Sequence, residues 1–270
     1  MIVLVAGAHG RVGSRVMALL LSRGHTVRAL VRTQSQADAL EEVGAQPMLA
    51  DLRGDVEWTA EGCDAAIFAA GARHRSELPA IDAGGAAKLA EAADRFDLRR
   101  FVLCSAVGAG WPGRREGPLR EFLTAKHAAE RRVERLDMSW TILRFGRLTE
   151  APGSGRISAS VPPGTPVTLN RDDAALVAVE ALAREHLGRQ VVHVIDGDRG
   201  VGAVLDAVEP LPLPAVRAHG LGAGQPDNPP TDRDMLRPDA SPLDADVDYE
   251  GDGPLPPELL GNEDPAPGIP

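Results

Sequence analysis

The chain has 270 residues, enough for one large domain or two small ones, and its formal net charge of −10 comes entirely from residues 209–270, which hold 13 acidic residues and three arginines. The neutral remainder offers no basic surface for nucleic acid, and two cysteines exclude a disulfide framework or a cysteine zinc site. No apolar run is long enough to span a bilayer and no signal peptide is recognised, so we expect a cytoplasmic protein with no membrane or nucleic-acid partner.

The first fourteen residues, MIVLVAGAHGRVGS, combine a strand, a glycine-rich turn and the start of a helix. A short apolar run, residues 2–6, ends in Gly7, and further glycines follow at Gly10 and Gly13. Glycines let the backbone turn sharply and approach a ligand, and a helix N-terminus offers N–H groups and a positive dipole end to a phosphate. In this setting the G-x-x-G-x-x-G spacing predicts a dinucleotide-binding turn rather than a plain strand–helix turn.

The alternation of strand and helix continues along the chain. Expected strands cover residues 26–31, 46–50, 64–70, 100–105, 139–145 and 190–195, and expected helices cover residues 34–43, 79–96, 117–136, 171–186 and 202–208. This series predicts an α/β fold, a doubly wound parallel sheet of the Rossmann type, in a single domain over residues 1–208. Right-handed crossovers bring the carboxyl ends of all strands to one edge of the sheet, where the ligand is expected.

The composition changes at residue 209. Residues 209–270 hold 14 of the 22 prolines, and apolar periodicity vanishes there. This segment has too little apolar surface to offset the entropy of ordering, which predicts a disordered acidic tail. The tail either binds a partner that the sequence does not identify or is a passive solvated extension.

Arg32 follows the second expected strand, where NAD-specific folds carry an acidic residue for the ribose 2′-hydroxyl. A guanidinium suits a 2′-phosphate because its fork donates two charge-assisted hydrogen bonds, and Arg11 in the glycine turn is placed to help. We therefore expect NADP as the cofactor, rather than NAD. Asp51, after the third strand, either accepts from the adenine amino group or caps the turn to Gly54.

Small residues follow the fourth strand, at Ala70 and Gly71. They let the backbone pass close to the nicotinamide half of the cofactor, although small residues also serve tight helix–sheet packing. The expected cofactor contacts are Gly7, His9, Gly10, Arg11, Val12, Gly13, Arg32, Asp51, Leu52, Ala70, Gly71 and Lys126.

Four segments together carry a family resemblance. They are GAHGRVG at residues 7–13, VLCSAVGAG at 102–110, FLTAKHAAE at 122–130 and TILRFGRLTEAPGSGRI at 141–157. With them, residues 1–208 resemble the atypical short-chain dehydrogenases/reductases of the NAD(P)H-binding type, related to NmrA-like and flavin-reductase-like proteins. Typical members use a serine to bind the substrate carbonyl, a tyrosine to exchange a proton, and a lysine to lower the tyrosine pKa and bind the ribose. The resemblance implies Ser105 and Lys126 as catalytic residues.

The tyrosine of that family is missing here. The resemblance places it four residues before Lys126, where Phe122 stands, and the only tyrosine in the chain is Tyr249. Phenylalanine has no hydroxyl and cannot act as an acid or a base. The family usually also has a proline where Phe145 stands.

Three functions remain open at this point. The chain is a reductase of a flavin, quinone or similar small acceptor that needs no tyrosine, with Ser105 steadying the acceptor and His9 or His127 relaying a proton. Alternatively it is a non-catalytic NADP(H)-binding redox sensor of the NmrA-like type, or a pseudoenzyme with a structural role. The reductase is favoured. A sugar-nucleotide epimerase or dehydratase is not, because that chemistry depends on the missing tyrosine and on a larger C-terminal substrate domain.

Residues 151–169 are rich in glycine, serine and proline. They form either a lid over the acceptor site or an ordinary surface excursion with a short hairpin. Asn170, Arg171 and Asp172 then begin the next helix, and we expect them to cap it.

Overall fold

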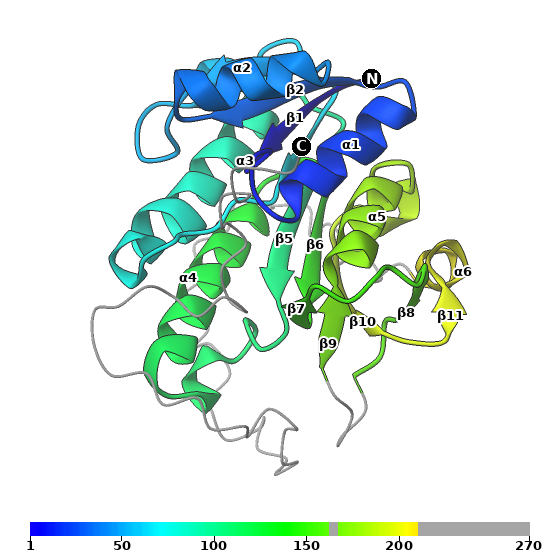
Figure 1. Ribbon diagram of the computed structural model, residues 1–270. Coiled ribbons are helices and arrows are strands. Elements are labelled where there is room, and N and C mark those ends of the chain that lie inside the picture. The colour runs from blue at the N-terminus through cyan, green and yellow to red at the C-terminus, as the bar shows by residue number, and fades with distance from the viewer. Residues whose placement is uncertain (162–166, 210–270) are drawn as a thin grey trace, which may run out of the picture.

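A twisted, mostly parallel sheet forms the centre of the computed structural model, which describes residues 1–161 and 167–209 (Figure 1). The strand order is β11-β8-β10-β6-β5-β4-β1-β2-β3. The parallel strands are β1 (Ile2–Ala6), β2 (Thr26–Val31), β3 (Gln46–Leu49), β4 (Ala65–Phe68), β5 (Arg100–Ala106), β6 (Trp140–Phe145) and β10 (Gln190–Asp196). At one edge β8 (Arg156–Ser158) pairs antiparallel with both β10 and β11 (Arg199–Gly200), and β7 (Arg147–Thr149) forms a separate parallel pair with β9 (Thr168–Asn170).

Helices cover both faces of the sheet (Figure 1). One layer contains α1 (Gly13–Ser22), α2 (Gln34–Glu42), α5 (Arg171–Leu182) and α6 (Val201–Asp206), and the other contains α3 (Ala86–Arg95) and α4 (Gly117–Val133). A π-helical segment, Pro79–Gly85, leads into α3, and short 3₁₀ turns lie at Glu57–Ala60, Arg75–Glu77, Pro112–Arg114 and Glu185–Leu187. The predicted doubly wound sheet is therefore confirmed.

The two cores are built by alternation along each buried strand. In β1, Val3 and Val5 pack toward the α1 and α5 side, whereas Leu4 and Ala6 pack toward the α3 and α4 side, and all four side chains are fully buried. Because helices cover both faces of this strand, none of these four side chains faces solvent, which explains the uninterrupted apolar run in the sequence.

Most predicted elements are confirmed to within a few residues, and the differences have local causes. Residues 79–96 were expected as one helix, but a π-helical segment that contains Gly84 and Gly85 comes first and the α-helix starts at Ala86. The helix expected at residues 171–186 ends at Leu182. The short strands β7, β8, β9 and β11 were not predicted, because two or three residues are too few to show a period of two.

The start of α5 confirms the expected cap at Asn170, whose side-chain oxygen accepts the N–H of Asp173 at 2.8 Å. The carboxylate of Asp173 in turn accepts the N–H groups of Ser154 at 3.0 Å and Gly155 at 2.8 Å. Burial would raise the pKa of Asp173, but a hydrogen bond from the Asn170 amide, together with those from the backbone N–H groups of Ser154 and Gly155 and the Ser154 hydroxyl, outweighs it and lowers the pKa. The first part of the predicted lid is thus tied to α5; residues 162–166 lie outside the described residues, and the lid itself stays a prediction.

The predicted disordered tail lies, apart from Glu209, outside the described residues. Across residues 1–161 and 167–209, no helix combines the length and the apolar character that crossing a membrane requires.

Truncation of a central core side chain should destabilise this fold far more than truncation of a rim side chain. Leu143 on β6 is fully buried, whereas Leu49 on the edge strand β3 is 52 % exposed. We expect Leu143→Ala to lower the free energy of unfolding by about 2–5 kcal/mol and Leu49→Ala to change it by less than about 0.5 kcal/mol. Urea titrations of the two variants provide the test, and equal losses would contradict the layered core described above.

Candidate functional site

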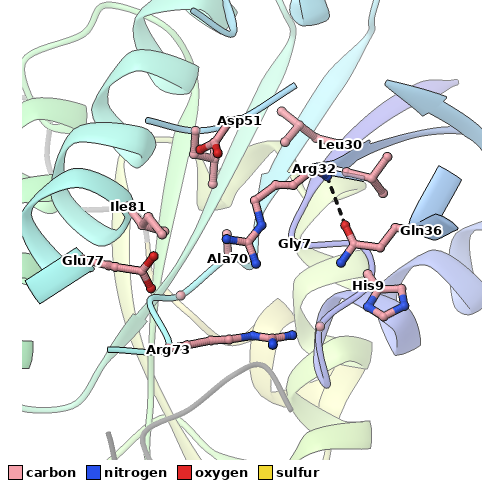
Figure 2. A pocket seen from close by; sticks show the side chains of 14 residues that line it. Gly7, His9, Leu30, Arg32, Gln36, Asp51, Ala70, Arg73, Glu77 and Ile81 are labelled. Atoms are coloured by element: carbon pink, nitrogen blue, oxygen red, sulfur yellow. Dashed lines mark hydrogen bonds between the residues drawn. The ribbon is translucent and has the colours of Figure 1, made fainter. Parts of the chain in front are cut away.

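A groove lies at the carboxyl ends of β1 to β4, on the edge of the sheet where a ligand was expected (Figure 2). It contains about 590 Å³ of empty space, including its open mouth. Its lining residues are Gly7, His9, Gly10, Leu30, Val31, Arg32, Gln36, Asp51, Leu52, Ala70, Gly71, Arg73, Glu77 and Ile81. Eight of the expected cofactor contacts are among them: Gly7, His9, Gly10, Arg32, Asp51, Leu52, Ala70 and Gly71.

The glycine turn is packed so closely that side chains are excluded from it. Gly7 has a φ of +84°, and a Cβ there would lie 2.7 Å from the Cα of Ala70. A Cβ on Gly13 would lie 2.0 Å from the carbonyl oxygen of Gly7. The turn is closed by the Gly10 N–H, which donates to the Gly7 carbonyl at 2.8 Å. This cradle has the shape that lets a backbone approach a pyrophosphate at the start of a helix.

Two charged groups mark the far end of the groove. Arg32 is exposed, and Figure 2 shows its side chain extending into the groove toward Ala70. Asp51 forms a bidentate ion pair with Arg53, whose Nη2 lies 2.6 Å from Oδ2 and whose Nε lies 3.0 Å from Oδ1. The hydrogen bonds from the Arg53 side chain lower the pKa of Asp51, and the charge of Arg32 contributes in the same direction.

Of the two roles that the sequence left open for Asp51, the structure shows the turn cap, and the contact with an adenine amino group stays a prediction. Its Oδ1 accepts the N–H of Arg53 at 2.9 Å, and its carbonyl accepts the N–H of Gly54 at 2.8 Å, so it caps the turn after β3. It also lines the groove. A carboxylate that is held ionised at this place can accept a hydrogen bond from an amino group.

Six groove residues were not expected from the sequence: Leu30, Val31, Gln36, Arg73, Glu77 and Ile81. Gln36 accepts the backbone N–H of Arg32 at 3.0 Å and so fixes the start of the Arg32 side chain (Figure 2). Arg73 and Glu77 lie in the irregular segment between β4 and the π-helical segment, where the sequence has no periodic signal. Only the tertiary fold brings them to the groove.

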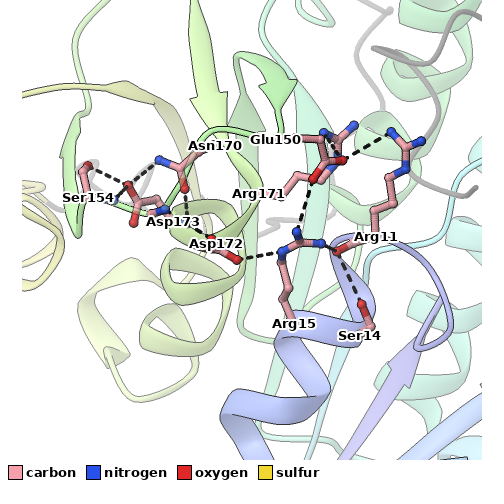
Figure 3. A network of polar contacts seen from close by, with 10 residues as sticks. Arg11, Ser14, Arg15, Glu150, Ser154, Asn170, Arg171, Asp172 and Asp173 are labelled. Carbon is pink, nitrogen blue, oxygen red and sulfur yellow. Dashed lines mark hydrogen bonds and ion pairs between the residues drawn. The ribbon is translucent and has the colours of Figure 1, made fainter. Parts of the chain in front are cut away.

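Arg11, Val12 and Gly13 do not line the groove. Arg11 forms an ion pair with Glu150 at 3.3 Å, and the same carboxylate holds Arg15 at 3.2 Å and Arg171 at 2.9 Å (Figure 3). The glycine turn is thereby joined to the chain that follows β7. Whether Arg11 also contacts a cofactor phosphate stays a prediction.

Lys126 and Ser105 are both buried, at 7 % and 5 % exposure, and each is held by a different carboxylate that the sequence analysis had not singled out. The ammonium of Lys126 pairs with Asp82 at 2.9 Å and donates to the carbonyl of Cys104 at 3.4 Å. The hydroxyl of Ser105 donates to Glu130 at 2.6 Å. Neither residue lines the groove, so their catalytic roles stay predictions.

Glu130 is the centre of a buried polar cluster. Arg144 binds it through two hydrogen bonds, at 3.0 Å and 2.7 Å. Ser105, Arg144 and His193 lie side by side on β5, β6 and β10. Burial lowers the pKa of His193, Arg144 lowers it further and Glu130 opposes the change.

The position implied for the family's tyrosine is filled by a packed ring. Phe122 is 9 % exposed, and the ammonium of Lys126 lies 5.5 Å from the ring centre. Cys104 is buried as expected for a small core residue, and burial raises the pKa of its thiol to about 12. A thiol with such a pKa is inert near neutral pH.

Comparisons with known proteins agree with this geometry. A family model for NAD(P)H-binding proteins matches residues 7–185. An uncharacterized sugar epimerase of Bacillus subtilis, YhfK, is 32 % identical over 210 residues, which cover 75 % of this chain and 98 % of that protein. A solved structure from Bacillus halodurans, provisionally assigned as an NAD-dependent epimerase/dehydratase, superposes with a TM-score of 0.71 at 28 % identity, covering 77 % of this chain and all of that one. The anaerobillin reductase ChuY from Escherichia coli O157:H7 shares the fold, with a TM-score of 0.64 at 23 % identity over 74 % of this chain and 98 % of its own.

A comparison of alanine substitutions at Gly7 and Gly24 separates the free-energy cost of crowding at the glycine turn from the cost of a positive φ. Gly24 has a similar φ of +75°, but no described atom lies within 4 Å of a Cβ placed there. Gly24→Ala should cost about 1–2 kcal/mol of folding free energy. Gly7→Ala should cost about 1–3 kcal/mol more, because the backbone of Ala70 must move. Urea unfolding of both variants measures the difference; equal losses would show that the turn is not crowded.

Proposed function

The chain belongs to the NAD(P)H-binding family, and from this premise we propose that it binds NADP(H) and reduces a small acceptor such as a flavin or a quinone. The observation that carries the proposal is the groove at the switch point of the sheet, which combines a glycine cradle at one end with Arg32 at the other. Such a groove suits a ligand with a pyrophosphate in its middle and a second phosphate on its adenosine ribose.

The preference for NADP rests on charge. Arg32 is the group that follows β2, and Arg73 adds a second guanidinium to the groove (Figure 2). A guanidinium donates two parallel hydrogen bonds to the charged oxygens of a phosphate, and it binds a neutral ribose hydroxyl less strongly. Asp51 also lines the groove, and its lowered pKa favours a carboxylate that can accept a hydrogen bond from the adenine amino group.

The acceptor class rests on what replaces the tyrosine. When bound, the nicotinamide supplies a hydride. The chain's part is then to orient the two reactants and to keep the acceptor in contact with the cofactor. Phe122 provides no proton, so the acceptor must be one whose reduced form takes its proton from water. Flavins and quinones meet this condition. The sugar epimerase chemistry in the name of the Bacillus subtilis relative is not proposed here, because it relies on the tyrosine.

A second candidate is a redox sensor that binds NADP(H) without turnover. The observation in its favour is that Ser105 and Lys126 are both buried and committed to carboxylates, Glu130 and Asp82. A site that only distinguishes the oxidised from the reduced cofactor needs no group free to touch an acceptor.

Arg32→Ala tests the cofactor preference. Loss of a charge-assisted contact of about 1.5–3 kcal/mol should weaken NADPH binding by about 10- to 100-fold, and should leave NADH binding within about threefold because NADH has no 2′-phosphate. Calorimetric titration of both cofactors measures the two effects. Arg95→Ala is the matched control, because Arg95 is exposed and pairs with Glu57 away from the groove. Equal losses for NADPH and NADH would refute the assignment of Arg32.

Addition of acceptors to the NADPH complex separates the reductase from the sensor. We expect FMN or a simple benzoquinone to oxidise the bound NADPH, followed as loss of its absorbance under single-turnover conditions. The rate should be nearly independent of pH between about 6 and 8, because no residue near the acceptor has to donate a proton. Tight NADPH binding without oxidation by either acceptor would favour the sensor.

A further inference from the structure

We propose that Asp82 is a positioning residue, which holds the ammonium of Lys126 beside the segment that follows β4, where it can bind the ribose of the nicotinamide half of the cofactor. The inference rests on the proposed function and adds a residue to it. Neither the turn-forming glycines nor Arg32 can serve this half of the ligand, because they lie at the pyrophosphate and adenosine positions of the groove.

A single buried carboxylate joins Lys126 to the groove wall. The Asp82 side chain is fully buried, with Oδ1 at 2.9 Å from the Lys126 ammonium. Its second oxygen, Oδ2, accepts the backbone N–H of Ala72 at 2.7 Å. The Asp82 carboxylate therefore fixes the position of the Lys126 ammonium relative to the segment that follows β4.

That segment is part of the groove. Gly71 lines it, and a Cβ on Gly71 would lie 3.7 Å from Oδ1 of Asp82. Ile81, the residue before Asp82, lines the groove as well. The Asp82 carboxylate consequently sits directly behind the wall, one residue layer from the ligand space.

The backbone at Asp82 is unusual in a way that suits this position. Asp82 lies in the π-helical segment Pro79–Gly85, whose wider turns are rare and often occur at functional sites. In this segment Ile81 reaches the groove while Asp82 reaches Lys126 and Ala72. The sequence alone predicts an ordinary helix here and gives no sign of the widened turn.

Lys126 retains capacity for a ligand. An ammonium has three N–H donors, and within the described residues its acceptors are Asp82 and the carbonyl of Cys104. The Phe122 ring covers another side, 5.5 Å away. A buried cation that loses its partner is strongly disfavoured, so the carboxylate of Asp82 is what keeps the ammonium at this point.

The test compares two ligands that differ by the nicotinamide half. NADPH contains it, whereas 2′,5′-ADP keeps the adenosine and the 2′-phosphate and lacks the nicotinamide ribose. We expect Asp82→Asn to weaken NADPH binding by about tenfold or more, and to change 2′,5′-ADP binding by less than about twofold. Calorimetry gives both constants, and thermal unfolding of each variant reports its stability.

A double-mutant cycle shows whether Asp82 acts through the lysine. Lys126→Met should reproduce the selective loss of NADPH affinity, and the double variant D82N/K126M should lose no more than Lys126→Met alone. The double variant carries no unpaired buried charge, so it remains measurable if Asp82→Asn does not fold. Lys88→Met is the matched control, because Lys88 is the chain's other lysine and bonds the Gly54 carbonyl at 2.6 Å outside the groove lining.

Each outcome either supports or contradicts the positioning role of Asp82. Selective loss of NADPH affinity with a non-additive cycle supports the inference. Equal losses for both ligands, no loss, an additive cycle, or failure of both the single and the double variant to fold would assign Asp82 a purely structural role. If the unmodified protein binds 2′,5′-ADP and NADPH, the cofactor-binding part of the proposed function stands whatever the variants do. If it binds neither NADPH nor NADH, the proposed function fails and this inference fails with it.

Discussion

The close passage of two backbone segments at the switch point of the sheet is the constraint on which the site depends. The order of the sheet reverses between β1 and β4, because β2 and β3 extend to one side and β5, β6 and β10 to the other. The turn after β1 must cross the end of β4 there, and it does so at a distance where even a methyl group on Gly7 would strike the backbone of Ala70. The crevice that opens above this crossing is the groove, and the fold therefore forms this candidate ligand site before any side chain contributes.

The parts of the molecule that the sequence predicts are those in which local pattern and tertiary environment agree. Buried parallel strands are apolar throughout because helices cover both faces, and the glycine turn is dictated by backbone crowding. Gln36, Arg73 and Glu77 could not be predicted as groove residues, because they approach it through loops and a helix start whose course depends on the whole sheet. Asp82 and Glu130 look like ordinary polar positions of helices, and only packing turns them inward.

Ion pairs connect the glycine turn to residues outside the groove. Glu150 holds Arg11 from the turn, Arg15 from α1 and Arg171 from α5 (Figure 3). Arg171 is only 2 % exposed, so this end of the network is shielded from screening, whereas Glu150 is 55 % exposed. A phosphate near Arg11 would compete with Glu150 for the same guanidinium. Glu150, the residue just before the predicted lid, therefore links that part of the chain electrostatically to the turn that would hold a cofactor.

The two buried carboxylates also constrain the chemistry. A serine hydroxyl has one proton, and Ser105 donates it to Glu130 at 2.6 Å. Arg144 donates to both oxygens of Glu130, at 3.0 Å and 2.7 Å. Ser105 is then left with lone pairs and can accept a hydrogen bond but not donate one to a carbonyl oxygen. Together with Phe122 in place of a tyrosine, this arrangement removes both usual donors to a substrate carbonyl. This arrangement is the reason that we propose hydride transfer to an acceptor that takes its proton from water.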